Sequence, residues 1–312
     1  MARTTRWTRD DLGPQDDRTV VVTGGSGGIG LRTAEVFAER GARVIIGARD
    51  AAKATAAVDS VRAAARRAGR TTRSDGVDWR PLDLADLGSV RGFADDVLGM
   101  TPSIDLLVNC AGVMAIPECR LTADGIEMHF GTNHIGHFAL TGLLLPALGA
   151  GRPARVVTVS AQSARTARLD VDDLQRENPR YAPMAAYGNS KLANVLFAVE
   201  LNRHVDPARV LSVPVHPGTA RTGIQQYSTS RVYRGVGQVI MRAVGQPLDR
   251  VADPIAFAAT SPEATPMSFV APTGPFELGG APGFVRLPAQ ADDDALRAAL
   301  WAESERLSGV AY

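Results

Sequence analysis

Cysteine is nearly absent from this chain of 312 residues, which contains only Cys110 and Cys119. Their spacing matches neither a CxxC motif nor a zinc-binding pattern, and two thiols do not make the disulfide framework of a small secreted domain. We therefore expect a reducing compartment, the cytoplasm, and no metal site.

Long apolar runs are missing as well. A transmembrane helix needs roughly 18 or more consecutive apolar residues. The best candidate, residues 140–150, is too short and contains Pro146. The N-terminal segment is polar and lacks the apolar core of a signal peptide. The sequence therefore predicts no membrane span.

The chain also lacks a large excess of positive or negative charge. Lys and Arg together number 34 and Asp and Glu number 33, which leaves a net charge of +1. No general attraction to nucleic acid or to an acidic membrane surface is therefore expected. Basic residues do cluster at 62–73, but this stretch is rich in alanine and is typical of a solvated helix face. Nucleic acid is not a predicted partner.

What the chain does contain is an alternation of short apolar runs and longer helix-like stretches. The apolar runs are residues 19–23, 43–47, 104–108, 155–159 and 210–215. The helix-like stretches are residues 29–40, 90–98, 126–145, 186–204 and, near the end, 292–307. Runs that are apolar throughout are typical of parallel strands covered on both faces.

This pattern predicts an α/β protein with a single Rossmann-type doubly wound parallel sheet and helices on both faces. We expect one dinucleotide-binding domain over residues 1–312, because no linker or internal repeat divides the chain. Residues 221–282, rich in Gly, Pro and Ala, are the expected substrate-pocket region. Since ligands of such sheets bind beyond the carboxyl ends of the strands, the segments after each strand should carry the chemistry.

The first strand is followed by TGGSGGIG, Thr23 to Gly30, which leads directly into a helix. Glycines at this turn let the main chain approach a pyrophosphate, and the helix N-terminus stabilises its negative charge. A glycine-rich turn without a ligand is the alternative. Its position at the first strand–helix junction favours binding.

The second strand is followed by Arg49 and Asp50. A site for NAD usually places a carboxylate near the strand end, where it binds the ribose 2′-hydroxyl. Here Ala48 is neutral and Arg49 is basic. Arginine suits the 2′-phosphate of NADP by its charge and its planar fork of donors. We therefore expect NADP, while Asp50, one or two positions late, keeps NAD as the alternative.

Tyr187 and Lys191 stand four residues apart in YGNSK, a spacing that places them on one face of a helix. An ammonium beside a phenol favours the phenolate, so we expect a lowered pKa for Tyr187. Such a tyrosine can pass a proton to or from a substrate oxygen. Of the 34 basic residues only Lys53 and Lys191 are lysines, which suggests that position 191 needs a compact ammonium.

Taken in order, these motifs resemble those of the short-chain dehydrogenase/reductase family. The similarity spans roughly residues 15–225 and consists of TGGSGGIG, Asp83, NCAG, GTNHIGHF, YGNSK and HPGTART. The sequence around GTNHIGHF and YGNSK is similar to that of the branch of the family that contains retinol dehydrogenases and protochlorophyllide reductases. Each motif alone is weak evidence, whereas the ordered set is specific.

The resemblance implies a set of cofactor-binding residues. It implies that the pyrophosphate loop consists of Gly24, Ser26, Gly28, Ile29 and Gly30. It places Arg49 at the 2′-phosphate and the adenine between Asp83 and Leu84. The ribose path would be lined by Asn109, Ala111 and Gly112. The carboxamide end of the nicotinamide would be held by Pro217, Gly218, Ala220 and Thr222.

The resemblance also implies catalytic roles for three residues. Tyr187 would be the general acid in reduction or the base in oxidation, Lys191 would bind the nicotinamide ribose, and Asn133 would hold a water in a proton relay toward Lys191. The implied activity is an NADP-dependent oxidoreductase that moves hydride between the nicotinamide and an apolar carbonyl, alcohol or activated C=C or C=N bond. The implied partner is a small apolar substrate. A homo-oligomer is suggested too, although this branch also contains monomers.

The chain departs from the family pattern at two positions. Cys110 stands where the second Asn of NNAG is usual, a change expected to alter local hydrogen bonding and not the class of activity. The catalytic serine is the second serine of a VSS triplet in the family, and here the triplet is Val159, Ser160 and Ala161. The missing hydroxyl would donate to a developing oxyanion, and losing one such donor typically costs about 10²–10³ in rate.

Ala161 leaves several interpretations open. Ser163 could replace the hydroxyl if the loop folds back, whereas alternation along the strand turns Ser160 to the opposite face. A substrate with a polarised C=C or an imine would depend less on the donor. The chain could instead be a non-redox enzyme, such as a cyclase or lyase, or an NADP-binding sensor protein. An engineered Ser→Ala substitution would look the same.

Overall fold

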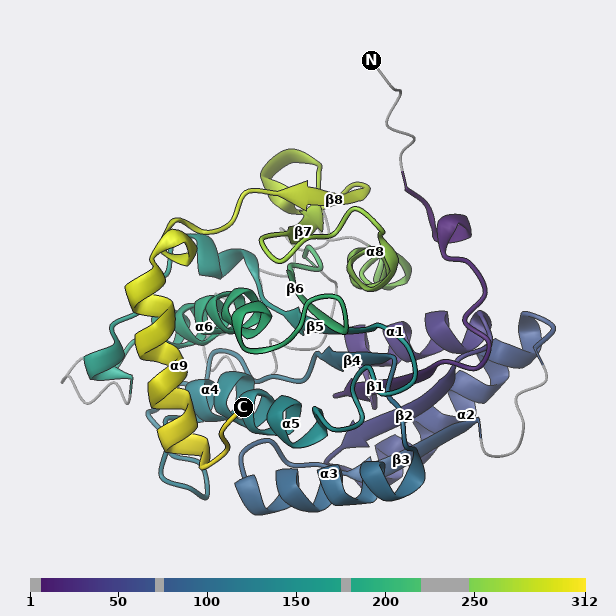
Figure 1. The fold of residues 1–312 in the computed structure, drawn as a ribbon, viewed down its shortest axis with the longest axis horizontal. Coiled ribbons are helices and arrows are strands. Elements are labelled where there is room, and N and C mark those ends of the chain that lie inside the picture. Colours follow the sequence, from purple (N-terminus) through teal and green to yellow (C-terminus); the bar gives the residue numbers. More distant parts are fainter. Residues whose placement is uncertain (1–6, 71–75, 175–180, 220–246) are drawn as a thin grey trace.

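The computed structural model of the chain describes residues 7–70, 76–174, 181–219 and 247–312. Its centre is an eight-stranded sheet in the order β3-β2-β1-β4-β5-β6-β7-β8 (Figure 1). The strands are β1 (Thr19–Thr23), β2 (Arg43–Ala48), β3 (Val77–Pro81), β4 (Leu106–Asn109), β5 (Ala154–Val159), β6 (Val210–Val215), β7 (Phe269–Pro272) and β8 (Pro282–Val285). Neighbours from β3 to β7 run parallel, and β8 is antiparallel to β7.

The order of the strands reverses at β1, which pairs with β2 on one side and with β4 on the other. Val22 is the partner of Ile46 in β2 and of Val108 in β4. All three side chains are fully buried, because helices cover both faces of the sheet. Ligands of doubly wound sheets bind at this kind of reversal, in the crevice beyond the strand ends.

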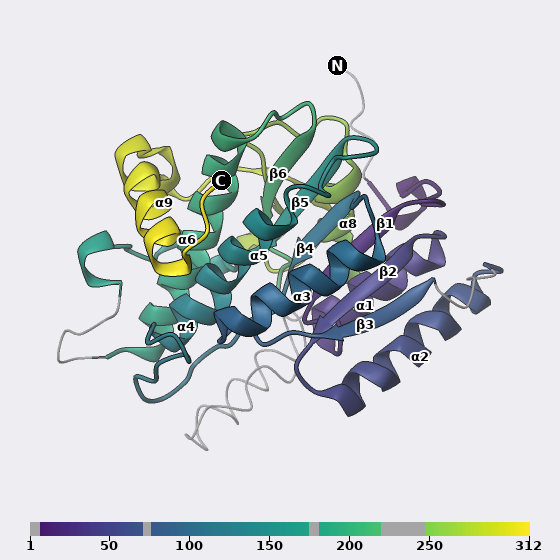
Figure 2. The same cartoon turned by 60° about the horizontal axis from the view of Figure 1, so that its bottom comes forward.

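The helices form two layers, one on each face (Figures 1 and 2). One hydrophobic cluster joins the sheet to α1 (Gly28–Glu39), α2 (Ala51–Arg67) and α8 (Asp253–Thr260). The second joins it to α3 (Leu87–Met100), α5 (Gly136–Leu144) and α6 (Pro183–His204). α9 (Asp294–Ser308) packs against α5 and α6, where Trp301 contacts Phe138 and Phe197. The predicted doubly wound α/β fold is confirmed, except that β8 is antiparallel to its neighbour.

The predicted helix over residues 126–145 is interrupted. It consists of α4 (Met128–Phe130), a π-helical turn (Gly131–Ile135) and α5. π-helical turns occur frequently at functional sites, and this one carries Asn133. Short 3-10 turns lie at Arg9–Asp11, Gln162–Arg165, Val171–Asp173, Leu248–Arg250, Pro275–Glu277 and Ala289–Asp292.

The expected substrate-pocket region, residues 221–282, is described only from residue 247 onward. That part forms α8 and β7 and reaches the start of β8, where the sequence indicated irregular structure. Across the described ranges, no helix combines the length and the apolar character needed to cross a membrane.

Candidate active site

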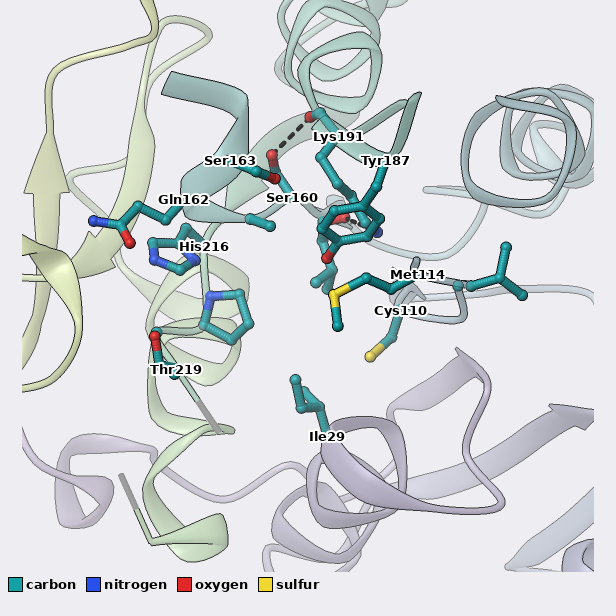
Figure 3. Close-up of a pocket in the computed structure, with 16 residues that line it drawn as sticks. Ile29, Cys110, Met114, Ser160, Gln162, Ser163, Tyr187, Lys191, His216 and Thr219 are labelled. Carbon is teal, nitrogen blue, oxygen red and sulfur yellow. Dashed lines mark hydrogen bonds between the residues drawn. The ribbon is translucent and has the colours of Figure 1, made fainter. Parts of the chain in front are cut away.

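Two connected hollows open beyond the carboxyl ends of the strands. The larger, of about 440 Å³, lies beyond β1, β2 and β4. The smaller, of about 220 Å³, lies beyond β5 and β6, next to α6 (Figure 3). Both are lined by Ile29, Cys110, Gly112 and Val113. We name the larger one the dinucleotide cleft and the smaller one the substrate pocket.

The glycine-rich turn forms one wall of the dinucleotide cleft. Gly24 has a φ of +68°, a conformation that favours glycine. A Cβ on Gly30 would lie 2.5 Å from the Gly24 carbonyl oxygen, so α1 can begin this close to β1 only with glycine here. The N-terminus of α1 thereby faces the cleft, and it suits a pyrophosphate. The residues of this turn that line the cleft are Gly24, Ser26, Gly27, Gly28, Ile29 and Gly30.

Two cationic side chains lie at the far end of the cleft. Arg49 follows β2, is 68% exposed and approaches Asp83 at 3.9 Å. Lys53 also lines the cleft and was not predicted as a site residue. Asp50, the residue that kept NAD as an alternative, accepts a hydrogen bond from the Lys53 main-chain N–H and caps α2. Its carboxylate therefore has a structural partner at the helix N-terminus.

The opposite wall comes from the segments after β3 and β4. Leu82, Asp83, Leu84, Ala111 and Gly112 line the cleft, as the resemblance implied for four of them. Asn109 is placed differently. Its amide is fully buried and donates to Thr141 at 3.0 Å, so it holds β4 to α5 and lines neither hollow.

Tyr187 and Lys191 lie on one face of α6, as predicted, and both line the substrate pocket. The Lys191 Nζ atom is 5.9 Å from the centroid of the Tyr187 ring and donates to the Val159 carbonyl oxygen at 3.1 Å. Burial lowers the pKa of Lys191 to about 8. Burial also raises the pKa of Tyr187, so the expected lowering is wrong for the chain as described here. Desolvation of the phenolate outweighs the attraction of the ammonium.

Asn133 links the π-helical turn to the loop after β4. Its Oδ1 accepts from the Val113 N–H at 2.7 Å, and its Nδ2 donates to the Val113 carbonyl at 3.0 Å and to the Ser190 hydroxyl at 2.9 Å. A Cβ on Gly112 would lie 2.8 Å from Asn133 Oδ1 and 3.4 Å from Lys191 Nζ. Tyr187 and Lys191 therefore line the substrate pocket, whereas Asn133 lines neither hollow and packs against Gly112, a residue that both hollows share.

The structure shows what replaces the usual serine at the end of β5. Ala161 lines the substrate pocket and is followed by a 3-10 turn at Gln162–Arg165. Ser160 donates to the Lys191 carbonyl at 2.7 Å, so its hydroxyl is occupied. Ser163 also lines the pocket, and its buried Oγ has no hydrogen-bond partner among the described residues. Gly188 packs against it, with an added Cβ 3.3 Å from the Ser163 carbonyl oxygen.

The segment after β6 completes the substrate pocket. Pro217 and Gly218 line it, as the resemblance implied. Ala220 and Thr222 lie outside the described residues. His216 and Met114 also line the pocket and were not predicted (Figure 3). The adjacency of His216 to Pro217 in the sequence was the only available signal.

A hydrogen-bonded group that the sequence did not predict, His129, Glu127 and Tyr181, packs next to Tyr187. The His129 ring lies edge-on to Tyr187, with centroids 6.4 Å apart. Its Nε2 accepts from the Ile116 N–H at 3.3 Å, which leaves Nδ1 to donate to Glu127 at 2.7 Å. The Tyr181 hydroxyl donates to the same carboxylate oxygen at 3.0 Å. Burial alone would raise the pKa of Glu127, but hydrogen bonds from His129 and a main-chain N–H hold it below its usual value.

Comparison with known proteins agrees with this geometry. Residues 18–232 match the short chain dehydrogenase family. Human retinol dehydrogenase 13 is 36% identical over 297 residues, which cover 94% of this chain and 85% of that protein. A crystal structure of an uncharacterised Mycobacterium paratuberculosis protein covers 98% of both chains with a TM-score of 0.78 and 37% identity. A short-chain dehydrogenase from Burkholderia cenocepacia in complex with NADP covers 78% of this chain and 91% of its own, with a TM-score of 0.59 and 26% identity.

The chain therefore belongs to the short-chain dehydrogenase/reductase family, in the branch that resembles the retinol dehydrogenases. It is an oxidoreductase by family, and the family uses a nicotinamide cofactor.

Proposed function

We propose that the chain is an NADP-dependent oxidoreductase that transfers hydride between the nicotinamide and the carbonyl or alcohol carbon of a small apolar substrate. The observation that carries the proposal is the presence of Tyr187 and Lys191 in the substrate pocket beside the junction that Gly112 forms with the dinucleotide cleft, where Asn133 packs against Gly112. A cofactor in the cleft and a substrate in the pocket would both reach this junction.

The choice of NADP over NAD rests on the far end of the cleft. Arg49 and Lys53 place two exposed cations there, each loosely paired with a carboxylate, Asp83 at 3.9 Å and Asp50 at 3.8 Å. Ala48 ends β2 where an NAD site would have a carboxylate. Asp50 is engaged as the cap of α2. The Burkholderia relative, which was solved with NADP, supports the same choice.

Bound NADPH would supply the hydride, which is the cofactor's own chemistry. In carbonyl reduction the Tyr187 phenol would donate its proton to the substrate oxygen as the carbon accepts the hydride pair. Burial favours this direction, because the raised pKa keeps Tyr187 protonated near neutral pH. Lys191 would bind the ribose and return a proton to Tyr187, and Asn133 would hold the Val113 loop beside them.

The walls of the pocket support an apolar substrate. Ile29, Val113, Met114 and Val159 line it, and methionine adapts its shape to irregular apolar ligands. Retinol, the substrate in the name of the human relative, is an apolar alcohol of this class. The identity of the substrate is a matter for screening.

The experiment is NADPH and NADH consumption, followed at the nicotinamide absorbance band against aldehydes, ketones, enones and imines. We expect NADPH oxidation with apolar carbonyls. Tyr187→Phe should lower kcat by about 10²–10⁴ while leaving NADPH affinity nearly unchanged. Full turnover by Tyr187→Phe would disprove the mechanism. Tight NADPH binding without consumption by any substrate would favour a sensor or a non-redox enzyme.

A further inference from the structure

The substrate pocket contains two buried polar side chains whose polar atoms form no close hydrogen bond, although the Glu277 main chain approaches the His216 ring. Among its described lining residues, the His216 ring nitrogens and the Ser163 hydroxyl are the buried side-chain polar atoms that make no hydrogen bond. Two other polar side chains of the pocket are already engaged. Ser160 donates to the Lys191 carbonyl, and the Gln162 amide donates to the Phe276 carbonyl.

The main chain fixes where His216 emerges. Val159 at the end of β5 pairs with Val215 at the end of β6, and the Ser160 N–H donates to the Val215 carbonyl at 2.7 Å. The His216 N–H in turn donates to the Val270 carbonyl in β7 at 2.8 Å. His216 therefore leaves the sheet opposite Ser160, one residue before Ala161, and both His216 and Ala161 line the pocket. Figure 3 shows its ring on one side of the pocket and the Tyr187 hydroxyl on the other.

The chemistry of the ring suits a neutral donor. His216 is only 3% exposed. Burial lowers the pKa of His216 to about 4, the charge of Arg165 acts in the same direction, and the Glu277 backbone opposes both. A neutral imidazole carries one N–H donor. It can stabilise negative charge on a reacting oxygen without giving up its proton.

We propose that His216 supplies the hydrogen bond to the substrate oxygen that Ala161 cannot supply. The inference rests on the proposed function. In carbonyl reduction the His216 N–H would donate to the oxygen as it gains negative charge, while Tyr187 transfers the proton and forms the new O–H bond. His216 would remain neutral throughout. The same contact would bind the hydroxyl oxygen of an alcohol substrate.

The test is a double-mutant cycle on the full chain. His216→Phe keeps a ring and removes the donor, and His216→Gln keeps an N–H. Each is made in the native background and with Ala161→Ser. The measurements are kcat and KM for an apolar ketone, NADPH affinity by fluorescence, and the unfolding temperature of each variant.

We expect His216→Phe to lower kcat by about 10²-fold, in the range for loss of one oxyanion donor. The affinity for NADPH should change by less than about threefold, because His216 is not proposed to contact the cofactor. His216→Gln should recover part of the rate. With Ala161→Ser the loss should shrink at least about tenfold, because the serine restores a donor.

Three results would overturn the assignment. An equal loss in both backgrounds would make the role of His216 structural. Equal rates for His216→Phe and His216→Gln would show that an N–H donor at position 216 does not contribute to catalysis. A loss of activity on Ser163→Ala, with none on His216→Phe, would assign the donor to Ser163. In all three cases Tyr187→Phe would still abolish turnover. If neither the native chain nor Ala161→Ser consumes NADPH, the proposed function fails, and this inference with it.

Discussion

Lys191 and Asn194, one turn apart on α6, both donate to the main-chain oxygen of Val159, each at 3.1 Å. If the Lys191 ammonium is removed, the buried Val159 carbonyl still accepts a hydrogen bond from Asn194. Burial lowers the pKa of Lys191 from 10.5 to about 8, so the folded state carries a cost for its charge at neutral pH. One unit of pKa corresponds to about 1.4 kcal/mol.

We predict that Lys191→Met abolishes turnover and raises the free energy of unfolding by about 1–3 kcal/mol at pH 7. The gain should be full below pH 8 and should decline as pH rises, vanishing above 10.5, where the lysine is neutral in both states. Urea unfolding at several pH values measures it. Lys53→Met, at an exposed lysine, is the control and should change stability by less than about 0.5 kcal/mol. A destabilised Lys191→Met protein would contradict the argument.

The second prediction concerns the choice of cofactor. Arg49→Ala should weaken NADPH binding by about 10–100-fold, because a hydrogen bond to a charged group contributes roughly 1.5–3 kcal/mol. NADH lacks the 2′-phosphate, so its affinity should change by less than about threefold. Fluorescence titration with both cofactors measures the difference. Arg80→Ala, which removes a cation paired with Asp78 outside the cleft, is the matched control. An equal loss for NADH and NADPH would show that Arg49 does not read the 2′-phosphate.

The third prediction concerns acid stability. Burial lowers the pKa of both His134 and His137 to about 3, and of His216 to about 4, from the ordinary value of 6.5. Below pH 6.5 the unfolded chain binds protons that the folded chain does not, so stability falls as pH falls. Between pH 6 and 4 the slope should approach about 4 kcal/mol per pH unit, about 1.4 for each histidine.

The slope, measured by denaturant unfolding at each pH, is the test of this third prediction. His134→Gln should lower it by about one proton, whatever its effect on absolute stability. A slope unchanged by that substitution would mean that His134 is already protonated in the folded protein.

The sequence predicts the central strands well because parallel strands buried on both faces are apolar throughout. β1 and β6 have the predicted bounds, and the others differ by one or two residues. β3 was missed as a strand because it lies at the edge of the sheet and four of its five residues are only partly buried or exposed. β7 and β8 are short, and they are recognisable only from their pairing in the folded sheet, where β7 lies between β6 and β8.

The candidate site likewise has features that the sequence predicts and features that it does not. Motifs of adjacent residues, such as the glycine-rich turn and the Tyr187–Lys191 pair, were visible in the sequence and line the two hollows. The environment of each residue was not visible. The sign of the Tyr187 pKa shift depends on burial, and the engagement of Asp50 depends on the start of α2. His216 and Ala161 come to the same pocket because strand register brings together the ends of β5 and β6, which lie more than 50 positions apart in the sequence.

The last prediction concerns the buried ion pair that ties α9 to α6. Arg297 Nε donates to Glu200 Oε2 at 2.9 Å, and the two side chains are only 4% and 6% exposed. Arg297 also pairs with Asp294, which is 66% exposed, so Glu200→Ala leaves the buried guanidinium with a carboxylate partner at the surface. The substitution should cost up to about 3–5 kcal/mol, the range for breaking a buried pair. Denaturant unfolding at pH 7 measures it.

The matched control is Glu303→Ala, which removes an exposed pair with Arg306 on the same helix α9. It should cost less than about 1 kcal/mol. The double variant Glu200→Leu/Arg297→Leu should be more stable than Glu200→Ala, because no uncompensated charge is left behind. If Glu200→Ala were as mild as the control, water or the carboxylate of Asp294 would be compensating Arg297, and the pair would not be what fixes α9 against α6.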